Sequence, residues 1–217
     1  MKRLVFLSML FFIGCAGMKV ERGVQDNMFH SSISPQINIR INPNFKYIGK
    51  AEHKKYKSYI SSYRGTTHTY ESYMFVQLDD NNIIKKAIVI KFLRMSKGHY
   101  IPISPKNTLK LTTEKIFGKY YKVYFRASTS PWYNYEEKFL EEKGYILPKL
   151  FMVKTLGRRF TTQNDNDSII YISYAEDIYY DSNYKKWNWK VNLLDDNQKA
   201  FMREFSERSE KNIQIVE

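Results

Sequence analysis

The chain has 217 residues, of which 43% are hydrophobic, and this is enough for one domain with a hydrophobic core. Its formal net charge of +13 suits an anionic partner such as lipid headgroups, lipopolysaccharide, a wall polymer or nucleic acid. A chain rich in Lys, Asn, Ile and Tyr is also what an AT-rich genome encodes, so the charge alone identifies no partner. The single cysteine excludes an intrachain disulfide.

The start of the chain has the pattern of an export signal. Met1-Lys2-Arg3 is cationic, Leu4–Ile13 is apolar apart from Ser8, and small residues flank Cys15. A transmembrane helix needs roughly 20 apolar residues, so this shorter run is typical of a secretory signal peptide.

The end of this segment, Phe12-Ile13-Gly14-Cys15, resembles the lipobox of bacterial lipoproteins, although leucine is commoner at the position of Phe12. The resemblance implies a diacylglycerol on the thiol of Cys15, cleavage just before Cys15, and usually an acylated new amino terminus. Two alternatives are a plain signal peptide with an incidental cysteine and a buried N-terminal helix.

Three segments are expected from this pattern. Residues 1–14 form the signal peptide and take no part in the fold. Residues 15–34 form a lipidated N-terminus and a tether, because they show no hydrophobic period and contain Gly, Ser, Asn and Asp. Residues 35–217 form a single α+β domain.

Alternation of hydrophobic and polar residues predicts strands along this domain. The Asp79–Asn82 segment has the composition of a hairpin turn, and Lys54–Tyr70 is either a long hairpin or a mobile loop. Ile88–Phe92 shows little alternation, which indicates a central strand buried on both faces. The predicted strands are 36–42, 45–53, 73–78, 83–95, 119–127, 150–155, 169–174 and 186–191.

Two helices are predicted, at about 131–143 and 196–210. Ser130 is a suitable N-cap for the first, with Pro131 at its first position and Gly144 as its stop. For the second, Asp195 and Gln198 have the spacing of a capping box. The order of elements indicates an α+β fold with a mostly antiparallel sheet of about six to eight strands and two helices.

Sequence motifs for catalysis and metal binding are weak. No two histidines have ligand spacing, and Asn164–Asp167 lacks the glycine and distal glutamate of a calcium loop, so we expect no metal and no cofactor. Ser182–Lys185 matches S-x-x-K but precedes a predicted strand, so we interpret the match as chance. The carboxylate pairs, including Glu136/Glu137, fall in predicted turns, caps or exposed helix faces, so we expect no catalytic residue.

Aromatic residues are unusually frequent, with 18 Tyr, 14 Phe and 3 Trp. Several lie among polar residues, in "SPWYNYEE" (130–137) and "IYYDSNYKKWNWK" (178–190). Flat rings beside Lys and Asn can stack on sugar rings. The alternative is that the Trp pair packs inside the sheet and the Tyr residues fill a strand edge. The candidate binding surface consists of Tyr179, Tyr180, Tyr184, Lys185, Lys186, Trp187 and Trp189.

These observations favour a lipid-anchored bacterial cell-envelope protein with a non-enzymatic binding or structural role. The alternative is an envelope enzyme that acts on glycan or lipid. The expected partners are the membrane, through lipidated Cys15, and either an anionic envelope polymer or another envelope protein, with no nucleic acid. The expected location is the outer membrane, facing the periplasm, in a Gram-negative cell, and otherwise the outer face of the plasma membrane.

Overall fold

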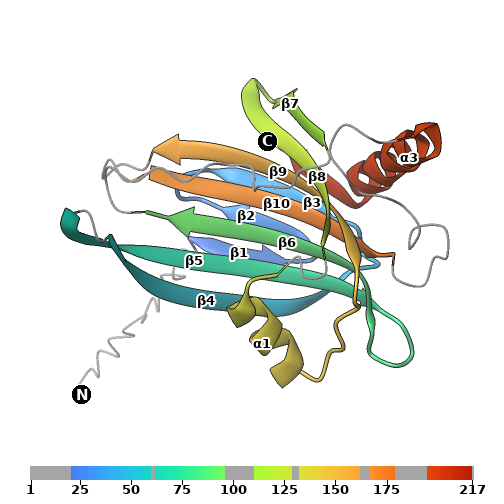
Figure 1. Cartoon of the computed structure of the whole chain (residues 1–217), viewed down its shortest axis with the longest axis horizontal. Helices are drawn as coiled ribbons and strands as arrows, with labels where there is room; N and C mark the ends of the chain where they lie inside the picture. The colour runs from blue at the N-terminus through green and yellow to red at the C-terminus, as the bar shows by residue number, and fades with distance from the viewer. Residues whose placement is uncertain are drawn as a thin grey trace, which may run out of the picture.

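The computed structural model of the chain describes residues 21–59, 62–95, 110–128, 132–161, 167–178 and 195–216. These residues form two sheets that stack face to face, with a helix on the outer face of the larger sheet and another at one end (Figure 1). All pairings between the named strands are antiparallel, so the fold is mostly antiparallel β.

The smaller sheet has the order β1-β2-β3-β11, with β1 (Arg22–Gln25), β2 (Met28–Ser31), β3 (Ile37–Ile41) and β11 (Ile213–Val216). The larger sheet has the order β4-β5-β6-β10-β9-β8-β7, with β4 (Lys46–Tyr59), β5 (Ser62–Leu78), β6 (Ile84–Arg94), β7 (Lys110–Ile116), β8 (Lys119–Ser128), β9 (Phe151–Thr161) and β10 (Asp167–Asp177). The helices of the described residues are α1 (Asn134–Glu142) and α3 (Asp196–Asn212).

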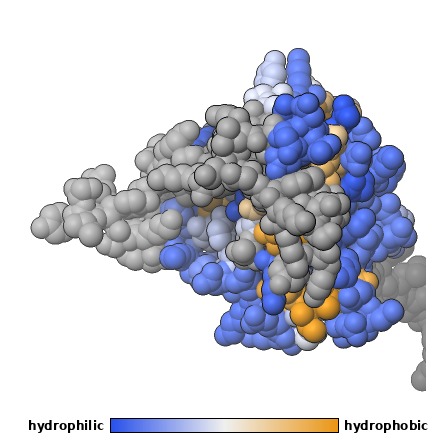
Figure 2. All heavy atoms as spheres, turned by 45° about the vertical axis from the view of Figure 1, so that its right-hand side comes forward, coloured by the Kyte–Doolittle hydropathy of each residue, from blue (hydrophilic) through white to orange (hydrophobic). Residues whose placement is uncertain are grey.

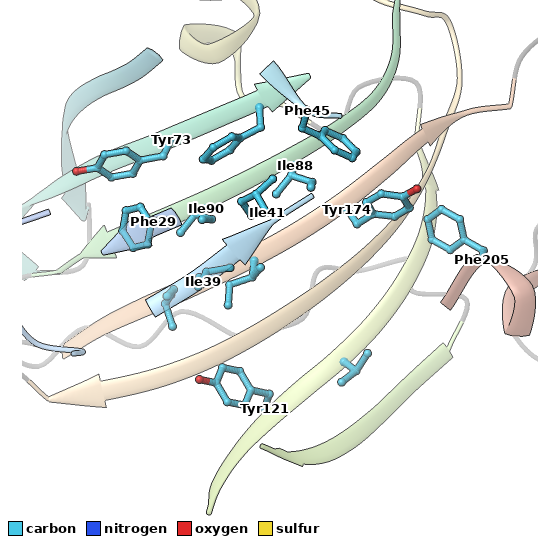
Figure 3. Close-up of a cluster of buried hydrophobic side chains, with 14 of the residues drawn as sticks. Phe29, Ile39, Ile41, Phe45, Tyr73, Ile88, Ile90, Tyr121, Tyr174 and Phe205 are labelled. Carbon is cyan, nitrogen blue, oxygen red and sulfur yellow. The ribbon is translucent and has the colours of Figure 1, made fainter. Parts of the chain in front are cut away.

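The main core lies between the two sheets. Side chains alternate between the two faces of a strand, so β5 and β6 direct Tyr73 and Ile90 toward the smaller sheet. There they meet Phe29 and Ile39, and Phe205 of α3 closes one end of the same cluster (Figure 3). Burial of each large apolar side chain stabilises the fold by about 1.5–3 kcal/mol.

Most of the predicted strands are confirmed. β3 occupies residues 37–41, and β6 lies between β5 and β10 inside the larger sheet, as its lack of alternation predicted. The turn at Asp79–Asn82 joins β5 to β6, and Asp79 Oδ1 accepts hydrogen bonds from the N–H groups of Asn81 and Ile83. Of the two alternatives for Lys54–Tyr70, the long hairpin is correct, because β4 pairs with β5 as far as Tyr59 and Ser62.

The tether expected over residues 15–34 is wrong from Arg22 onward. β1 and β2 form a hairpin that pairs with β3, and Phe29 of this hairpin is fully buried in the core. Asp26 and Asn27 connect the two strands with φ values of 49° and 55°, and a type I′ turn requires positive φ at both central residues. Strands of four residues are too short to show a hydrophobic period, so the sequence pattern missed them.

Arg22 fixes this hairpin to the larger sheet. Its Nη1 atom lies 2.7 Å from Glu71 Oε2 on β5, and its guanidinium carbon lies 3.9 Å from the centroid of the Phe92 ring. Lys50 Nζ lies 2.7 Å from the other oxygen of Glu71. Burial alone would raise the pKa of Glu71, but hydrogen bonds from Lys50, Tyr73 and Arg22 outweigh burial and lower that pKa below its ordinary value.

The prediction of one sheet with about six to eight strands needs correction, because the strands divide between sheets of four and seven. β7 and β11 were not predicted. β7 is an edge strand with a polar sequence, KLTTEKI, and β11 has only four residues and directly follows α3. The strand predicted at 186–191 lies outside the described residues.

Both predicted helices are confirmed, with one changed boundary. The N-cap of α1 is Tyr133 and not Ser130, because the Tyr133 N–H donates to Glu136 Oε2 at 2.7 Å. Ser130 and Pro131 lie outside the described residues. The helix stops as predicted at Gly144, which has a φ of 78°.

The N-terminus of α3 agrees with the predicted capping box. Asp195 Oδ1 accepts the Gln198 N–H at 2.8 Å, and Gln198 Oε1 accepts the Asp195 N–H at 3.0 Å. Arg208 then holds the helix against β10 through a bidentate contact with Glu176, with its shortest N–O distance at 2.9 Å. Lys154 of β9 donates to Glu210 at 2.9 Å, so two ion pairs attach α3 to the larger sheet.

Replacement of Phe29 tests whether the N-terminal hairpin belongs to the core. We expect Phe29→Ala to lower the free energy of unfolding by about 3–5 kcal/mol, because it leaves a cavity between the sheets. The matched control, Tyr120→Ala, removes a ring that is 66% exposed and should change stability by less than about 0.5 kcal/mol. Urea denaturation followed by circular dichroism measures both, and equal midpoints for the two variants would contradict the assignment.

Candidate functional site

The outer face of the larger sheet is apolar beneath α1, where Met74, Val89 and Leu140 pack together. Further along the same face, the pattern is interrupted by a lysine in the middle of the apolar run of β6. This residue, Lys91, pairs directly across the strands with Ser72 of β5. Both side chains point away from the main core, toward the first turn of α1.

The two polar side chains meet the buried carboxylate of Glu136 on α1. Lys91 Nζ lies 2.9 Å from Glu136 Oε2, and Ser72 Oγ donates to Glu136 Oε1 at 2.5 Å. The hydroxyl of Tyr135 and the N–H of Tyr133 also donate to this carboxylate, at 3.2 and 2.7 Å. Glu136 is fully buried, and its four donors compensate for the loss of water around it.

The charges in this network change the proton affinities of its members. Burial lowers the pKa of the Lys91 ammonium, and the attraction of Glu136 opposes that decrease without cancelling it. Burial raises the pKa of both Tyr133 and Tyr135, and the negative charge of Glu136 raises both further. The phenols therefore keep their protons in neutral solution, and the Tyr135 hydroxyl remains a hydrogen-bond donor.

Above this network lies a group of rings that we call the tyrosine platform: His53, Tyr70, Tyr133 and Tyr135. The imidazole of His53 stacks on Tyr135 with centroids 5.1 Å apart and planes 10° apart, and Tyr133 lies nearly parallel to Tyr135 at 6.0 Å. Tyr70 meets Tyr133 edge to face at 5.6 Å. The ring of Tyr133 is the outermost of the four, with 47% of the residue exposed.

The buried network holds the tyrosine platform in place. Tyr133 is fixed by its N–H bond to Glu136 and by Lys91, whose Nζ lies 3.8 Å from the centroid of the Tyr133 ring. Tyr135 is fixed by its hydroxyl, which lies 2.8 Å from Ser72 Oγ and also contacts Glu136. Solvent therefore meets pre-positioned aromatic rings, while the hydroxyl of Ser72 and the carboxylate of Glu136 stay buried.

Of the residues singled out in the sequence, some lie outside the described residues and one lies in a different environment from the expected one. Cys15 and the whole candidate surface lie outside the described residues, namely Tyr179, Tyr180, Tyr184, Lys185, Lys186, Trp187 and Trp189. The expectation that Glu136 lies on an exposed helix face is wrong, because α1 turns this residue toward Lys91. The stretch "SPWYNYEE" supplies Tyr133 and Tyr135 of the platform. The sequence signal for the charged partner of Glu136 was the lone lysine, Lys91, in the apolar run "IVIKFLR".

The described surface on the side toward α3 is mostly hydrophilic, with hydrophobic residues confined to a limited area (Figure 2). None of the described helices is long and apolar enough to span a bilayer. Among the described ranges, no group of three or more His, Cys, Asp and Glu residues is placed to hold a metal ion.

Comparisons with known proteins give no relative. A scan against protein-family models matches no family, and searches of curated proteins and of solved structures find no significant match.

Replacement of Lys91 tests the buried network. We expect Lys91→Met to destabilise the fold by about 3–5 kcal/mol, because the Glu136 carboxylate is left buried without its counter-charge. The double variant Lys91→Met/Glu136→Gln removes both charges and should recover much of that loss. Urea denaturation of the two variants and the wild type measures this coupling, and a single variant with wild-type stability would refute the ion pair.

Proposed function

We propose that this chain is a lipid-anchored protein of the bacterial cell envelope that binds saccharide rings on its tyrosine platform without changing them chemically. The observation that supports this function best is the Tyr133 ring, which is exposed to solvent yet held from behind by Glu136 and Lys91. A surface ring fixed in this way loses little side-chain freedom when it binds a ligand.

A sugar ring is the ligand that suits this surface. One face of a pyranose presents C–H groups that pack on an aromatic ring, and its hydroxyls form hydrogen bonds around the edge. Tyrosine offers both an apolar face and a polar tip. His53, which stacks on Tyr135, adds ring nitrogens that can form hydrogen bonds with sugar hydroxyls.

The same arrangement makes the alternative, an envelope enzyme acting on glycan or lipid, less favourable. Among the described residues, two hydroxyls form hydrogen bonds with Glu136, those of Ser72 and Tyr135. Ser72, the candidate nucleophile of the two, is fully buried. A substrate carbon would need to come within about 3–3.5 Å of that oxygen to react. Binding needs only the exposed rings.

The anchoring part of the proposal depends on Gly14-Cys15 after the apolar run. Two or three acyl chains at Cys15 would hold the protein at the membrane almost irreversibly, since each buried CH₂ contributes about 0.8 kcal/mol. The membrane is the outer membrane, facing the periplasm, in a Gram-negative cell, and the plasma membrane otherwise. The positive charge of the chain suits the anionic surface of either membrane.

Binding to envelope polysaccharide tests the role of the platform. Wild-type protein should co-sediment with purified peptidoglycan or bind immobilised lipopolysaccharide, and Tyr133→Ala should weaken that binding by about 1 kcal/mol or more. Tyr133→Phe keeps the ring and should retain most of the affinity, and Tyr120→Ala is the matched control away from the platform. Wild-type protein that binds neither polymer, or a Tyr133→Ala variant with unchanged affinity, would refute the saccharide proposal.

Metabolic labelling tests the anchor. Cells that express the chain in the presence of an alkyne fatty acid should incorporate label into the wild type and none into Cys15→Ser, because Cys15 carries the only thiol in the chain. The variant should also keep its signal peptide and migrate as a larger species. Label retained in Cys15→Ser would contradict the lipobox assignment.

A further inference from the structure

A cavity of about 500 Å³ opens between the two sheets, at the edge where β11 faces the β7–β8 hairpin. Its walls combine apolar side chains, including Ile37, Ile116, Tyr121 and Ile215, with a polar edge. The volume lies within the range of about 300–1,000 Å³ that is usual for small-molecule sites. None of the residues of the tyrosine platform lines this cavity.

A smaller cavity of about 80 Å³, which we call the slot, lies next to it, and the two share Ile116 and Ile215 as lining residues. Apolar side chains, including Leu156, Ile172 and Ile213, supply most of the surface of the slot, and Glu114, Lys154, Ser209 and Glu210 complete its lining. A ligand that occupies both spaces would place a small apolar part in the slot and its larger part in the wider cavity.

The mouth of the cavity is polar. His30 Nδ1 lies 3.0 Å from Asn38 Oδ1, which places two hydrogen-bonding side chains there. Lys119 is exposed on the β8 side, and within the described part of the chain its ammonium has no carboxylate partner. A cation beside an apolar slot is complementary to an anionic headgroup that carries a hydrocarbon chain.

The position of the N-terminal segment places this mouth near the membrane, if the proposed anchoring at Cys15 is correct. The carbonyl of Glu21 accepts the N–H of Ser32, which lines the cavity, at 2.9 Å. Only five residues lie between Cys15 and Glu21, and a chain of that length spans at most about 20 Å. A lipid-anchored protein would thus hold the cavity within reach of membrane lipids.

We propose that this cavity binds a single acyl chain with an anionic head, with the chain between Ile116 and Ile215 and the head beside Lys119. Two sources share this chemistry: a free fatty acid and a lysophospholipid. Binding itself needs neither lipidation nor the tyrosine platform, although access to membrane lipid depends on the proposed anchor.

Displacement of dansyl-undecanoic acid from the purified full chain tests the proposal. The probe should bind with saturation and a blue-shifted emission, and oleate or lysophosphatidylglycerol should displace it; the more effective competitor identifies the source. Ile215→Trp fills the shared wall and should weaken probe binding at least about tenfold. Gln214→Trp is the matched control, because Gln214 is exposed next to it on β11.

The charge at the mouth is tested separately. Lys119→Gln should weaken binding of oleate about fivefold and leave competition by dodecanol, which has no charge, unchanged. Lys122→Gln on the same strand should affect neither competitor, and Tyr133→Ala should leave probe binding intact even if the saccharide proposal fails. Absence of saturable probe binding, or equal affinities for Ile215→Trp and Gln214→Trp when urea denaturation shows both to be folded, would overturn the proposal.

Discussion

The buried ion pair between Lys91 and Glu136 determines how α1 lies on the larger sheet. Removal of two charges from water costs several kcal/mol for each ion, and only good geometry with further hydrogen bonds compensates for that cost. Ser72, Tyr135 and the Tyr133 N–H supply those bonds. A helix rotated by one residue would leave the lysine unpaired in an apolar surface, so the pair selects one seating of the helix and one arrangement of its tyrosines.

The junction between the two layers depends on the same strand. Glu71 and Ser72 are neighbours on β5, and adjacent side chains of a strand point to opposite faces. Glu71 binds Arg22 of the N-terminal hairpin on the inner side, while Ser72 binds Glu136 of α1 on the outer side. One dipeptide thus joins the larger sheet to the smaller sheet and to the helix that carries the platform.

Local sequence patterns predicted an element correctly where residues within that element are enough to specify it. The alternation at Ile37–Ile41 and the capping pair of Asp195 and Gln198 both predicted elements that the structure confirms. They did not predict the burial or the contacts of a side chain whose partner lies far away in the chain. Glu136 looks like any surface residue of a short helix until Lys91, far away in sequence, is placed beside it, and no periodicity encodes that encounter.

The pairing of β11 with β3 has a consequence for the order of folding. All seven strands of the larger sheet lie between these two strands in the chain, so the fourth strand of the smaller sheet is translated only after the larger sheet has been made. Contacts between such distant segments are slow to form because a long loop must close first. A nascent chain therefore cannot complete the smaller sheet until Ile213–Val216 have been synthesised, and until then one edge of β3 lacks its strand partner.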